Sequence, residues 1–378
     1  MQTEICKRLG CEVPIFAFSH SKEVVVEVTK AGGFGCFGAL THSPEELEEE
    51  LSWIDAQLGG RPYGVDIIIP KSFDEKAAAA KGPLRSLVPA ELRAFVDRLL
   101  DEAGIPDLPA EEEERIYSQF AQRERNYTPQ GAQKLIDVTL QHKGVKLIVS
   151  ALGAPPREMV DDFHARGILV GGMCGHVSHA KYHLQAGADL LIAQGSEAGG
   201  HTGTITTLVL VPDVIAAAGT VPVLAAGGIG KGDQIAAAVA MGAQGVWCGT
   251  IWLGAKESEL SPLERSVLLR SKAEDAVISR WMSGKPLRMI RSRSTDAWEK
   301  PGAPQPLQPP LQSILYHVAR ARIERAGRAD FCSFPAGQLA GTINEETTVA
   351  EIMEDMKRGY RQALERLRHL LPEYEAGI

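Results

Sequence analysis

Short apolar runs alternate with longer amphipathic stretches along most of this chain. The apolar runs are rich in Val, Ile, Leu and Ala, a composition typical of strands buried on both faces of a parallel sheet. Predicted strands therefore span residues 14–18, 34–40, 64–70, 145–150, 168–170, 190–193, 221–225 and 245–248. Between them, apolar residues at helical spacing predict helices over residues 22–30, 44–58, 129–141, 157–165, 177–186, 208–218 and 231–241.

Eight strands, each followed by a helix, are the count of a closed (β/α)8 barrel, the TIM barrel of the α/β class. Glycine follows several predicted helices, at Gly167, Gly187 and Gly242, where it is the usual residue to end a helix. An open, doubly wound sheet of eight strands is the alternative. We expect the barrel.

Two segments depart from this alternation. Residues 71–143 follow the third strand with charged, helix-forming sequence, and we expect a helical insertion that covers a site or makes an oligomer contact. Past residue 255, helices are predicted over residues 264–270, 274–281, 311–325 and 349–371. The predicted domains are a barrel over 1–255 with that insertion, a helical appendage over 256–328, and a segment over 329–378 that packs back on the barrel.

The candidate chemistry begins in the loop after the predicted strand 190–193. Gln194 and Gly195 open a segment of small residues that also contains Gly200 and His201. Loops at the carboxyl ends of strands carry the chemistry of parallel α/β folds. His201 is the one side chain of this loop able to titrate near neutral pH, so we favour a functional histidine over a loop histidine bonded to backbone.

Two further glycine sites follow the last two predicted strands. The first contains Gly227 and Gly228, and the second contains Gly249 and Thr250. In barrels, the loops after strands seven and eight commonly bind phosphate through backbone N–H groups and the start of a helix. Tight turns would explain either pair alone, but their place after adjacent strands favours a phosphate site. A phosphate there and His201 on a neighbouring loop would frame a cofactor lying across the barrel mouth.

The net charge and the cysteine content indicate which kinds of partner and which cellular compartment to expect. The formal net charge is -8 and there is no Lys/Arg block, so a nucleic-acid partner is not expected. The six cysteines include no C-x-x-C pair and no Cys/His metal spacing, which indicates reduced thiols, no metal site and a cytoplasmic protein. No apolar run is long enough to predict a membrane span, and the first residues do not read as an export signal.

Three blocks of sequence match a known family. They read A-Q-G-S-E-A-G-G-H-T-G at 193–203, V-P-V-L-A-A-G-G-I-G at 221–230 and M-G-A-Q-G-V-W-C-G-T at 241–250. Together they resemble the nitronate monooxygenases, formerly called 2-nitropropane dioxygenases, which are FMN enzymes on a TIM barrel. Weaker matches at 31–39, 62–66 and 334–341 extend the resemblance over most of the chain.

The resemblance implies a set of contacts to FMN. Its phosphate would lie on Gly227, Gly228, Gly249 and Thr250, and the rest of the cofactor near Asp66, Gln194, Gly195 and Gly200. His201 would be the catalytic residue, either as a base that removes the α-proton of a neutral nitroalkane or as a group that holds an anionic nitronate. The substrates would be this small molecule and O2, and the products a carbonyl compound and nitrite.

The sequence also departs from the family pattern. The first loop has Phe18, Ser19 and His20 where the family usually carries a Pro-Met pair, and Asp66 stands where Asn is frequent. Asp in place of Asn loses two amide donors and adds negative charge near the flavin unless the carboxyl is protonated or paired, and His20 is a candidate partner. We also expect four residues at the barrel mouth: Phe18, His20, Met173 and His176.

Three functions compete on this scaffold. The first is nitronate oxidation with O2. The second is an NADH- or NADPH-dependent flavin reductase acting on a quinone or an enoyl thioester, because the similar flavin enoyl-ACP reductases share the G-G-H loop. The third is a flavin-binding protein without turnover, which His201 argues against because a structural loop needs no titratable group. The appendage could bury the interface of a homodimer or only cap the barrel.

Overall fold

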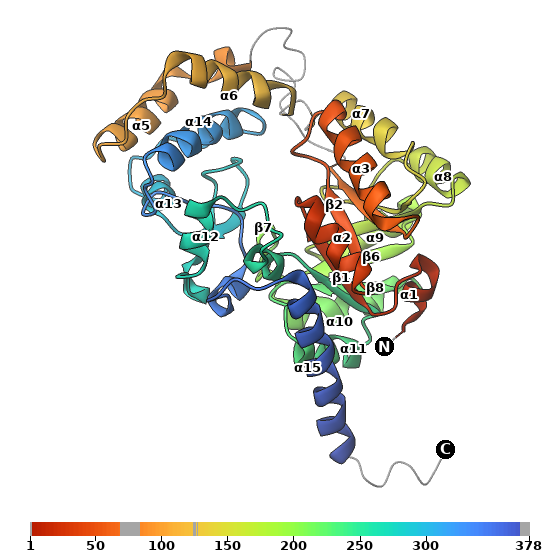
Figure 1. Cartoon of the computed structure of the whole chain (residues 1–378). Helices are drawn as coiled ribbons and strands as arrows, with labels where there is room; N and C mark the ends of the chain where they lie inside the picture. The colour runs from red at the N-terminus through yellow and green to blue at the C-terminus, as the bar shows by residue number, and fades with distance from the viewer. Residues whose placement is uncertain (1, 69–83, 124–125, 127, 371–378) are drawn as a thin grey trace, which may run out of the picture.

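The structure, a computed structural model, describes residues 2–68, 84–123, 126 and 128–370. Eight parallel strands close into a barrel, and β9 pairs with β1 to complete it (Figure 1). The predicted α/β barrel is therefore confirmed. In spatial order the strands are β1 (Ile15–Ser19), β2 (Phe34–Gly38), β3 (Tyr63–Ile67), β4 (Val145–Ser150), β5 (Leu169–Cys174), β6 (Leu190–Gln194), β8 (Val223–Ala226) and β9 (Gly245–Cys248).

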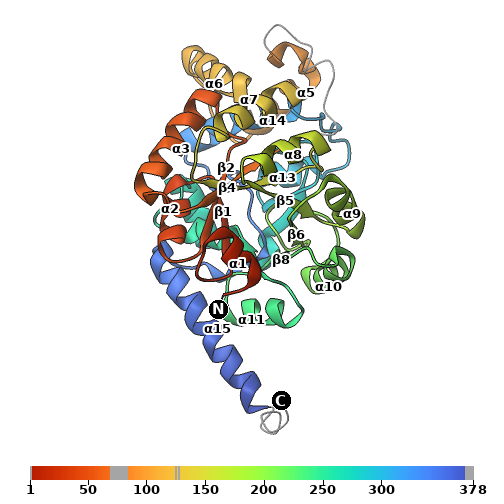
Figure 2. The ribbon, with the colours of Figure 1, turned by 90° about the vertical axis from the view of Figure 1, so that its right-hand side faces the viewer.

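Helices surround the barrel, and their apolar stripes cover the outward faces of the strands (Figure 2). They are α2 (Lys22–Lys30), α3 (Pro44–Leu58), α7 (Pro129–Thr139), α8 (Arg157–Ala165), α9 (Val177–Ala186), α10 (Thr207–Ala218), α11 (Gly232–Ala240) and α15 (Val349–His369). The start of α3 follows from its sequence, because Ser43 and Glu46 form a capping box and Pro44 takes the first helical position. The last helix, α15, packs along α11 and α2.

Side chains of alternate strand residues fill the barrel interior. Phe16, Phe34 and Leu190 pack there with Leu9 of the short helix α1 (Glu4–Leu9). The strands are thus held by a close-packed core, and their carboxyl ends carry the loops with the candidate chemistry.

The insertion after β3 and the appendage pack together into a second hydrophobic cluster, called here the helical body, beside the barrel (Figure 1). Its helices are η1 (Leu84–Leu87), α5 (Ala90–Asp101), α6 (Ala110–Arg123), α12 (Pro262–Leu268), α13 (Arg293–Trp298), α14 (Leu311–Arg325) and η5 (Gln338–Thr342). Both α5 and α6 lie against α14. Residues 71–83 of the predicted insertion lie outside the described residues, and the domain limits at 255 and 328 stay a prediction.

One predicted helix of the appendage is wrong. Residues 274–281 form the end of the 3-10 turn η4 (Ala273–Asp275) and the strand β10 (Ala276–Ser279), whose β-branched Val-Ile pair favours a strand. β10 pairs with β11 (Leu287–Ile290), and β11 pairs in turn with β7 (Gly200–His201), a two-residue strand that the sequence did not predict. This three-stranded sheet ties the helical body to the loop after β6.

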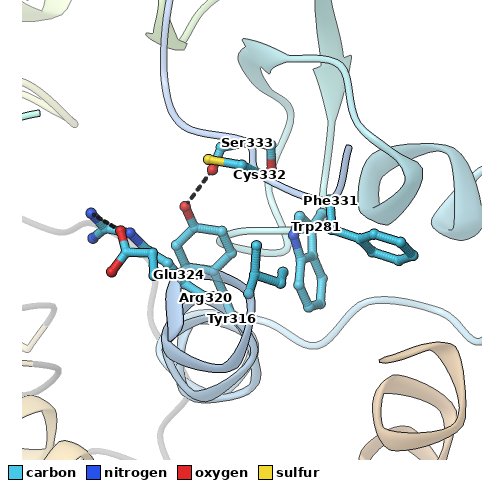
Figure 3. A pocket seen from close by; sticks show the side chains of 8 residues that line it. Trp281, Tyr316, Arg320, Glu324, Phe331, Cys332 and Ser333 are labelled. Carbon is cyan, nitrogen blue, oxygen red and sulfur yellow. Dashed lines mark hydrogen bonds and ion pairs between the residues drawn. The ribbon is translucent and has the colours of Figure 1, made fainter. Parts of the chain in front are cut away.

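A small cavity lies inside the helical body (Figure 3). On one side the Tyr316 hydroxyl donates to the backbone oxygen of Ser333 at 2.8 Å. On another side Trp281 packs against Tyr316 and Trp298, with ring centroids 5.6 and 5.5 Å apart. These contacts fix Trp281, which begins the turn between β10 and β11 that faces the barrel loop.

Candidate active site at the carboxyl ends of the strands

The loop that leaves β6 is held by its own side chains. Gln194 Nε2 donates to the backbone oxygen of His201 at 2.9 Å, and Thr202 Oγ1 donates to that of Gly195 at 3.1 Å. A Cβ atom at Gly195 would lie 2.1 Å from Thr207 Oγ1, so this close approach requires glycine. The loop therefore folds back on itself, and Gln194 fixes the position of His201.

Glu197 has a structural role in the same loop. Its carboxylate accepts from the backbone N–H and the hydroxyl of Thr207, both at 2.9 Å, at the first turn of α10. An acidic group at a helix start is favourable to the helix dipole. The Thr207 hydroxyl also lies 3.2 Å from the carbonyl oxygen of Ala226 and 2.9 Å from that of Gly227. The pair thus joins the loop after β6 to the loop after β8.

His201 lies on β7 and is half-buried. Its Nε2 atom is 2.9 Å from the hydroxyl oxygen of Ser283 in the helical body. Burial and, second, the nearby positive charge of Lys285 lower the pKa of His201 to about 4. The imidazole is therefore neutral at physiological pH, so it can accept a proton or a hydrogen bond.

The glycines predicted to hold a phosphate lie at the ends of the adjacent strands β8 and β9. Gly227 and Gly228 have φ angles of 102° and 67°, a left-handed conformation that favours glycine. Gly249 directly precedes the 3-10 turn η3 (Thr250–Gly254). Within the described residues, the backbone N–H groups of Gly227, Gly228 and Gly249 have no acceptor. Free N–H groups beside a helical turn form an anion site, so this glycine cradle fits a phosphate.

Two further contacts brace the glycine cradle. Gln234 Nε2 donates to the backbone oxygen of Gly228 at 2.7 Å, from the first turn of α11. The hydroxyl of Thr250 accepts from the backbone N–H of Gly337 at 2.9 Å. The segment 334–341, a weaker match in the sequence, thus contacts the cradle directly.

Asp66 lies on β3 and is 4% exposed. Its Oδ2 atom has no hydrogen-bond partner among the described residues. Burial raises the pKa of Asp66 to about 7, so a large fraction of the carboxyl carries a proton at neutral pH. The predicted partner is wrong: His20 Nδ1 lies 3.0 Å from the backbone oxygen of Gly38 instead. A protonated Asp66 can donate a hydrogen bond to a ligand, as Asn would.

The residues expected at the barrel mouth have different surroundings. Phe18 stacks on Trp247 with ring centroids 6.2 Å apart, and meets the ring of His20 edge-on at 5.2 Å. Met173 is half-buried on β5. His176 is exposed and caps α9, because its Nδ1 accepts from the N–H two residues further on at 3.1 Å. The structure thus gives His176 a structural role, while Phe18 and His20 lie together at the end of β1.

Sequence reasoning missed Ser283 and Lys285. Ser283 follows His201 by 82 residues, and it lies next to a segment that was expected to be a helix. No sequence periodicity or spacing predicts a contact between residues that far apart in the chain. The S-G-K-P sequence at 283–286 is a turn signal that could have replaced the predicted helix, but it does not reveal which loop the turn contacts.

Comparison with known proteins decides the family. The sequence model of the nitronate monooxygenases matches residues 14–359. The chain belongs to the nitronate monooxygenase family. It is 41% identical to Rv1533 of Mycobacterium tuberculosis, whose monooxygenase name is provisional, over 98% of this chain and 100% of that protein. It is 26% identical to a protein provisionally named nitronate monooxygenase in Staphylococcus aureus, over 94% of this chain and 98% of the relative.

Solved structures agree with this family at the level of the fold. A nitroalkane oxidase from Streptomyces ansochromogenes superposes with a TM-score of 0.78 and 24% identity, over 96% of this chain and 99% of that one. FabK from Thermotoga maritima has a TM-score of 0.72 and 26% identity, over 98% of this chain and 99% of that one. As a nitronate monooxygenase family member, the protein is a flavin-dependent oxidoreductase.

The described ranges contain neither a membrane-spanning helix nor a cluster of metal ligands. No helix in them is long and apolar enough to cross a membrane. They also contain no group of three or more His, Cys, Asp or Glu that could hold a metal ion.

Proposed function

We propose that this protein is an FMN-dependent nitronate monooxygenase that oxidises alkyl nitronates with O2 to a carbonyl compound and nitrite. The observation that carries the proposal is the neutral imidazole of His201, held by Gln194 and Ser283 on the loop next to the glycine cradle. Family membership supports the reaction, and the cradle supports a phosphorylated flavin.

The cofactor we propose is FMN. Its phosphate would bind the N–H groups of Gly227, Gly228, Gly249 and Thr250, and its remaining parts would lie near Asp66, Gln194, Gly195 and Gly200. Bound flavin supplies the electron acceptor for the organic substrate and the electron donor for O2. The protein's part is to bind the cofactor without water at its phosphate, orient it, and place a proton acceptor beside it.

His201 is that proton acceptor in our proposal. With a neutral nitroalkane, its free ring nitrogen takes the α-proton, while Gln194 holds the backbone of His201 and Ser283 orients its ring. With a nitronate, which has already lost this proton, the N–H of the neutral ring donates a hydrogen bond to a nitronate oxygen. Because the pKa of His201 is lowered to about 4, the neutral form persists down to this pH instead of 6.5.

One observation favours a second candidate, an NADH- or NADPH-dependent flavin reductase acting on a quinone or an enoyl thioester. FabK from Thermotoga maritima is similar over nearly the whole chain, and its identity of 26% equals that of the S. aureus relative. The same site could serve both reactions, since each passes electrons through a flavin.

The proposal is tested by turnover of the His201→Asn variant. We expect nitrite formation from propyl-2-nitronate by the native protein without nicotinamide, and a loss of about 100-fold or more in kcat/KM from 2-nitropropane in the variant. Flavin absorbance should be retained. His369→Asn, an exposed residue at the end of α15, is the matched control. Full activity of His201→Asn towards 2-nitropropane would remove the catalytic assignment.

The pH dependence of the reaction provides a second test of the role of His201. A His201 pKa lowered by burial leaves the base active while pH falls past 6.5, and activity is lost only as pH approaches about 4. We therefore expect the acid limb of kcat/KM for 2-nitropropane to lie well below pH 6.5.

A further inference from the structure

The turn between β10 and β11 places Ser283 against His201 and brings Lys285 near it. Ser283 Oγ lies 2.9 Å from His201 Nε2, and the same oxygen accepts from the backbone N–H of Lys285 at 3.4 Å. The strand pairing sets this arrangement, because Leu287 of β11 is the register partner of His201. Lys285 therefore lies two residues before Leu287, the residue of the helical body that pairs with His201 of the catalytic loop.

The turn is rigid. Gly284 has a φ angle of 77°, and a Cβ atom there would lie 1.7 Å from the backbone oxygen of Leu307, so only glycine fits. Its N–H donates to the backbone oxygen of Arg280 at 2.9 Å. The fully buried Gln312 donates to the backbone oxygen of Trp281, also at 2.9 Å, from below the turn. The backbone of Lys285 is thus fixed by contacts on both sides, with Trp281 anchored in the wall of the cavity (Figure 3).

Lys285 carries a charge that the described part of the chain leaves unpaired. It is half-buried, and none of the described acidic residues forms an ion pair with its ammonium. The acidic side chain of the catalytic loop, Glu197, is already bonded to Thr207. Lys285 is close enough to His201 to disfavour protonation of the imidazole. A partly desolvated cation without a protein partner is a ready site for an anionic ligand.

We propose that Lys285 is the anion-binding residue of this active site and selects nitronates over neutral nitroalkanes. The inference rests on the proposed function. The Lys285 ammonium donates to a negatively charged oxygen of the nitro group, while the neutral His201, oriented by Ser283, completes the polar contacts on that side. Neutral His201 supplies no charge, and the guanidinium of Arg288 is bonded to the backbone oxygens of Ser196 and Ala276, so Lys285 compensates the charge of the substrate. Burial, and second the charge of Lys285, disfavours protonation of His201.

The test compares Lys285→Gln and Lys285→Arg with the native holoenzyme, and Lys300→Gln serves as an exposed control lysine. Charge-assisted hydrogen bonds contribute enough for about a 10- to 100-fold change in binding. We expect Lys285→Gln to raise the KM for propyl-2-nitronate by that factor and to change the KM for neutral 2-nitropropane much less. Lys285→Arg should recover most of the nitronate affinity. Equal KM values for nitronate in native and Lys285→Gln protein would overturn the proposal.

A second measurement separates this inference from the proposed reaction. Nitrate is a planar anion that cannot be turned over as a nitronate, so its binding is followed by the change in flavin absorbance and by the NMR titration of His201. We expect Lys285→Gln to weaken nitrate binding about 10-fold or more and to raise the pKa of His201. If the native protein binds nitrate through Lys285 but forms no nitrite from nitronate, the reaction is wrong and the anion site stands. If nitrate binding is unchanged in the variant, the anion site is wrong.

Discussion

Asp66 carries a carboxyl group at a position in the barrel that favours its neutral form. Its folded-state pKa of about 7 is above the ordinary 3.8, so its contribution to stability is fully present below pH 3.8 and is lost as pH rises through about 7. The difference between these two pKa values corresponds to about 4 kcal/mol in the free energy of unfolding. An amide of the same shape has no proton to lose.

We therefore predict that Asp66→Asn raises the melting temperature at pH 8 and changes it much less at pH 5. Asp213→Asn, on the exposed face of α10, should change neither value. Thermal unfolding followed by circular dichroism at both pH values provides the measurement. A shift of equal size at pH 5 and pH 8 would show that the carboxyl is not held in its neutral form. An unchanged flavin affinity in the variant would agree with a protonated Asp66 that already donates as an amide does.

Single residues differ in how far the sequence could predict them. The loop of His201 and the glycines at 227 and 228 were predictable because strand, turn and glycine occur in one local stretch. Both glycines adopt left-handed conformations in the structure, and glycine itself is the residue that indicates such a conformation in a sequence. Ser283 and Lys285 were not predictable, because their place beside His201 depends on a pairing between distant strands. The proposed contact between Asp66 and His20 was wrong, because His20 Nδ1 lies 3.0 Å from the backbone oxygen of Gly38 instead.

Among the elements of the site, the start of α10 connects the loop after β6 with the loop after β8, the two loops proposed to hold the cofactor. Thr207 shares its hydroxyl with the carboxylate of Glu197 and with the carbonyl oxygens of Ala226 and Gly227. Replacing Thr207 by Val keeps the shape of the side chain and leaves these acceptors with one donor fewer. An unmade hydrogen bond at a partly buried group costs about 1–3 kcal/mol.

We predict that Thr207→Val weakens FMN binding several-fold while the barrel stays folded. The neighbouring Thr206→Val is the matched control, because Thr206 is exposed and its side chain makes no capping bond. Flavin affinity would be measured by fluorescence quenching on reconstitution of the apoprotein. If both variants bind FMN as tightly as the native protein does, the hydrogen bonds of Thr207 are not needed to hold the glycine cradle in its binding conformation.

The barrel elements were largely predictable, because buried parallel strands leave a short apolar signal and each is followed by a helix with one apolar stripe. β7 and β10 were not. β7 has two residues and no apolar pattern, and it exists because β11 offers it backbone hydrogen bonds. β10 was mistaken for a helix, because four residues are too few to separate the two periodicities.

In the molecule as a whole, one buried arginine holds the insertion to the appendage. The Arg322 side chain on α14 is 3% exposed and donates to Asp101 at 2.6 Å and to the backbone oxygen of Ile105 at 2.8 Å. Loss of Arg322 removes several charge-assisted hydrogen bonds and a packed side chain, which costs about 3 kcal/mol although Asp101 itself is 59% exposed, whereas an exposed pair contributes about 1 kcal/mol or less. Arg325 on the same helix is 51% exposed and pairs with Glu112.

We predict that Arg322→Ala destabilises the helical body by about 3 kcal/mol and Arg325→Ala by less than about 1 kcal/mol. Trp281 and Trp298 lie in that cluster, so their fluorescence reports its unfolding in urea. Equal effects of the two substitutions would mean that the insertion is held by apolar contacts and not by Arg322.

The sequence predicted the existence of the insertion and the appendage but not that they pack on each other. Each has amphipathic helices, and an apolar stripe does not specify which other stripe will cover it. The contact of α5 and α6 with α14 joins residues about 200 positions apart. Such pairings depend on the shape of the whole chain and leave no local signal.

Flavin absorbance measured anaerobically tests the central claim most directly. The purified, FMN-loaded protein would be mixed separately with propyl-2-nitronate, NADH and NADPH in the absence of O2. Our account predicts that the nitronate alone changes the oxidised flavin bands, and that admitting O2 restores them with release of nitrite. Rapid reduction by NADH or NADPH with no response to the nitronate would contradict the account and favour the reductase.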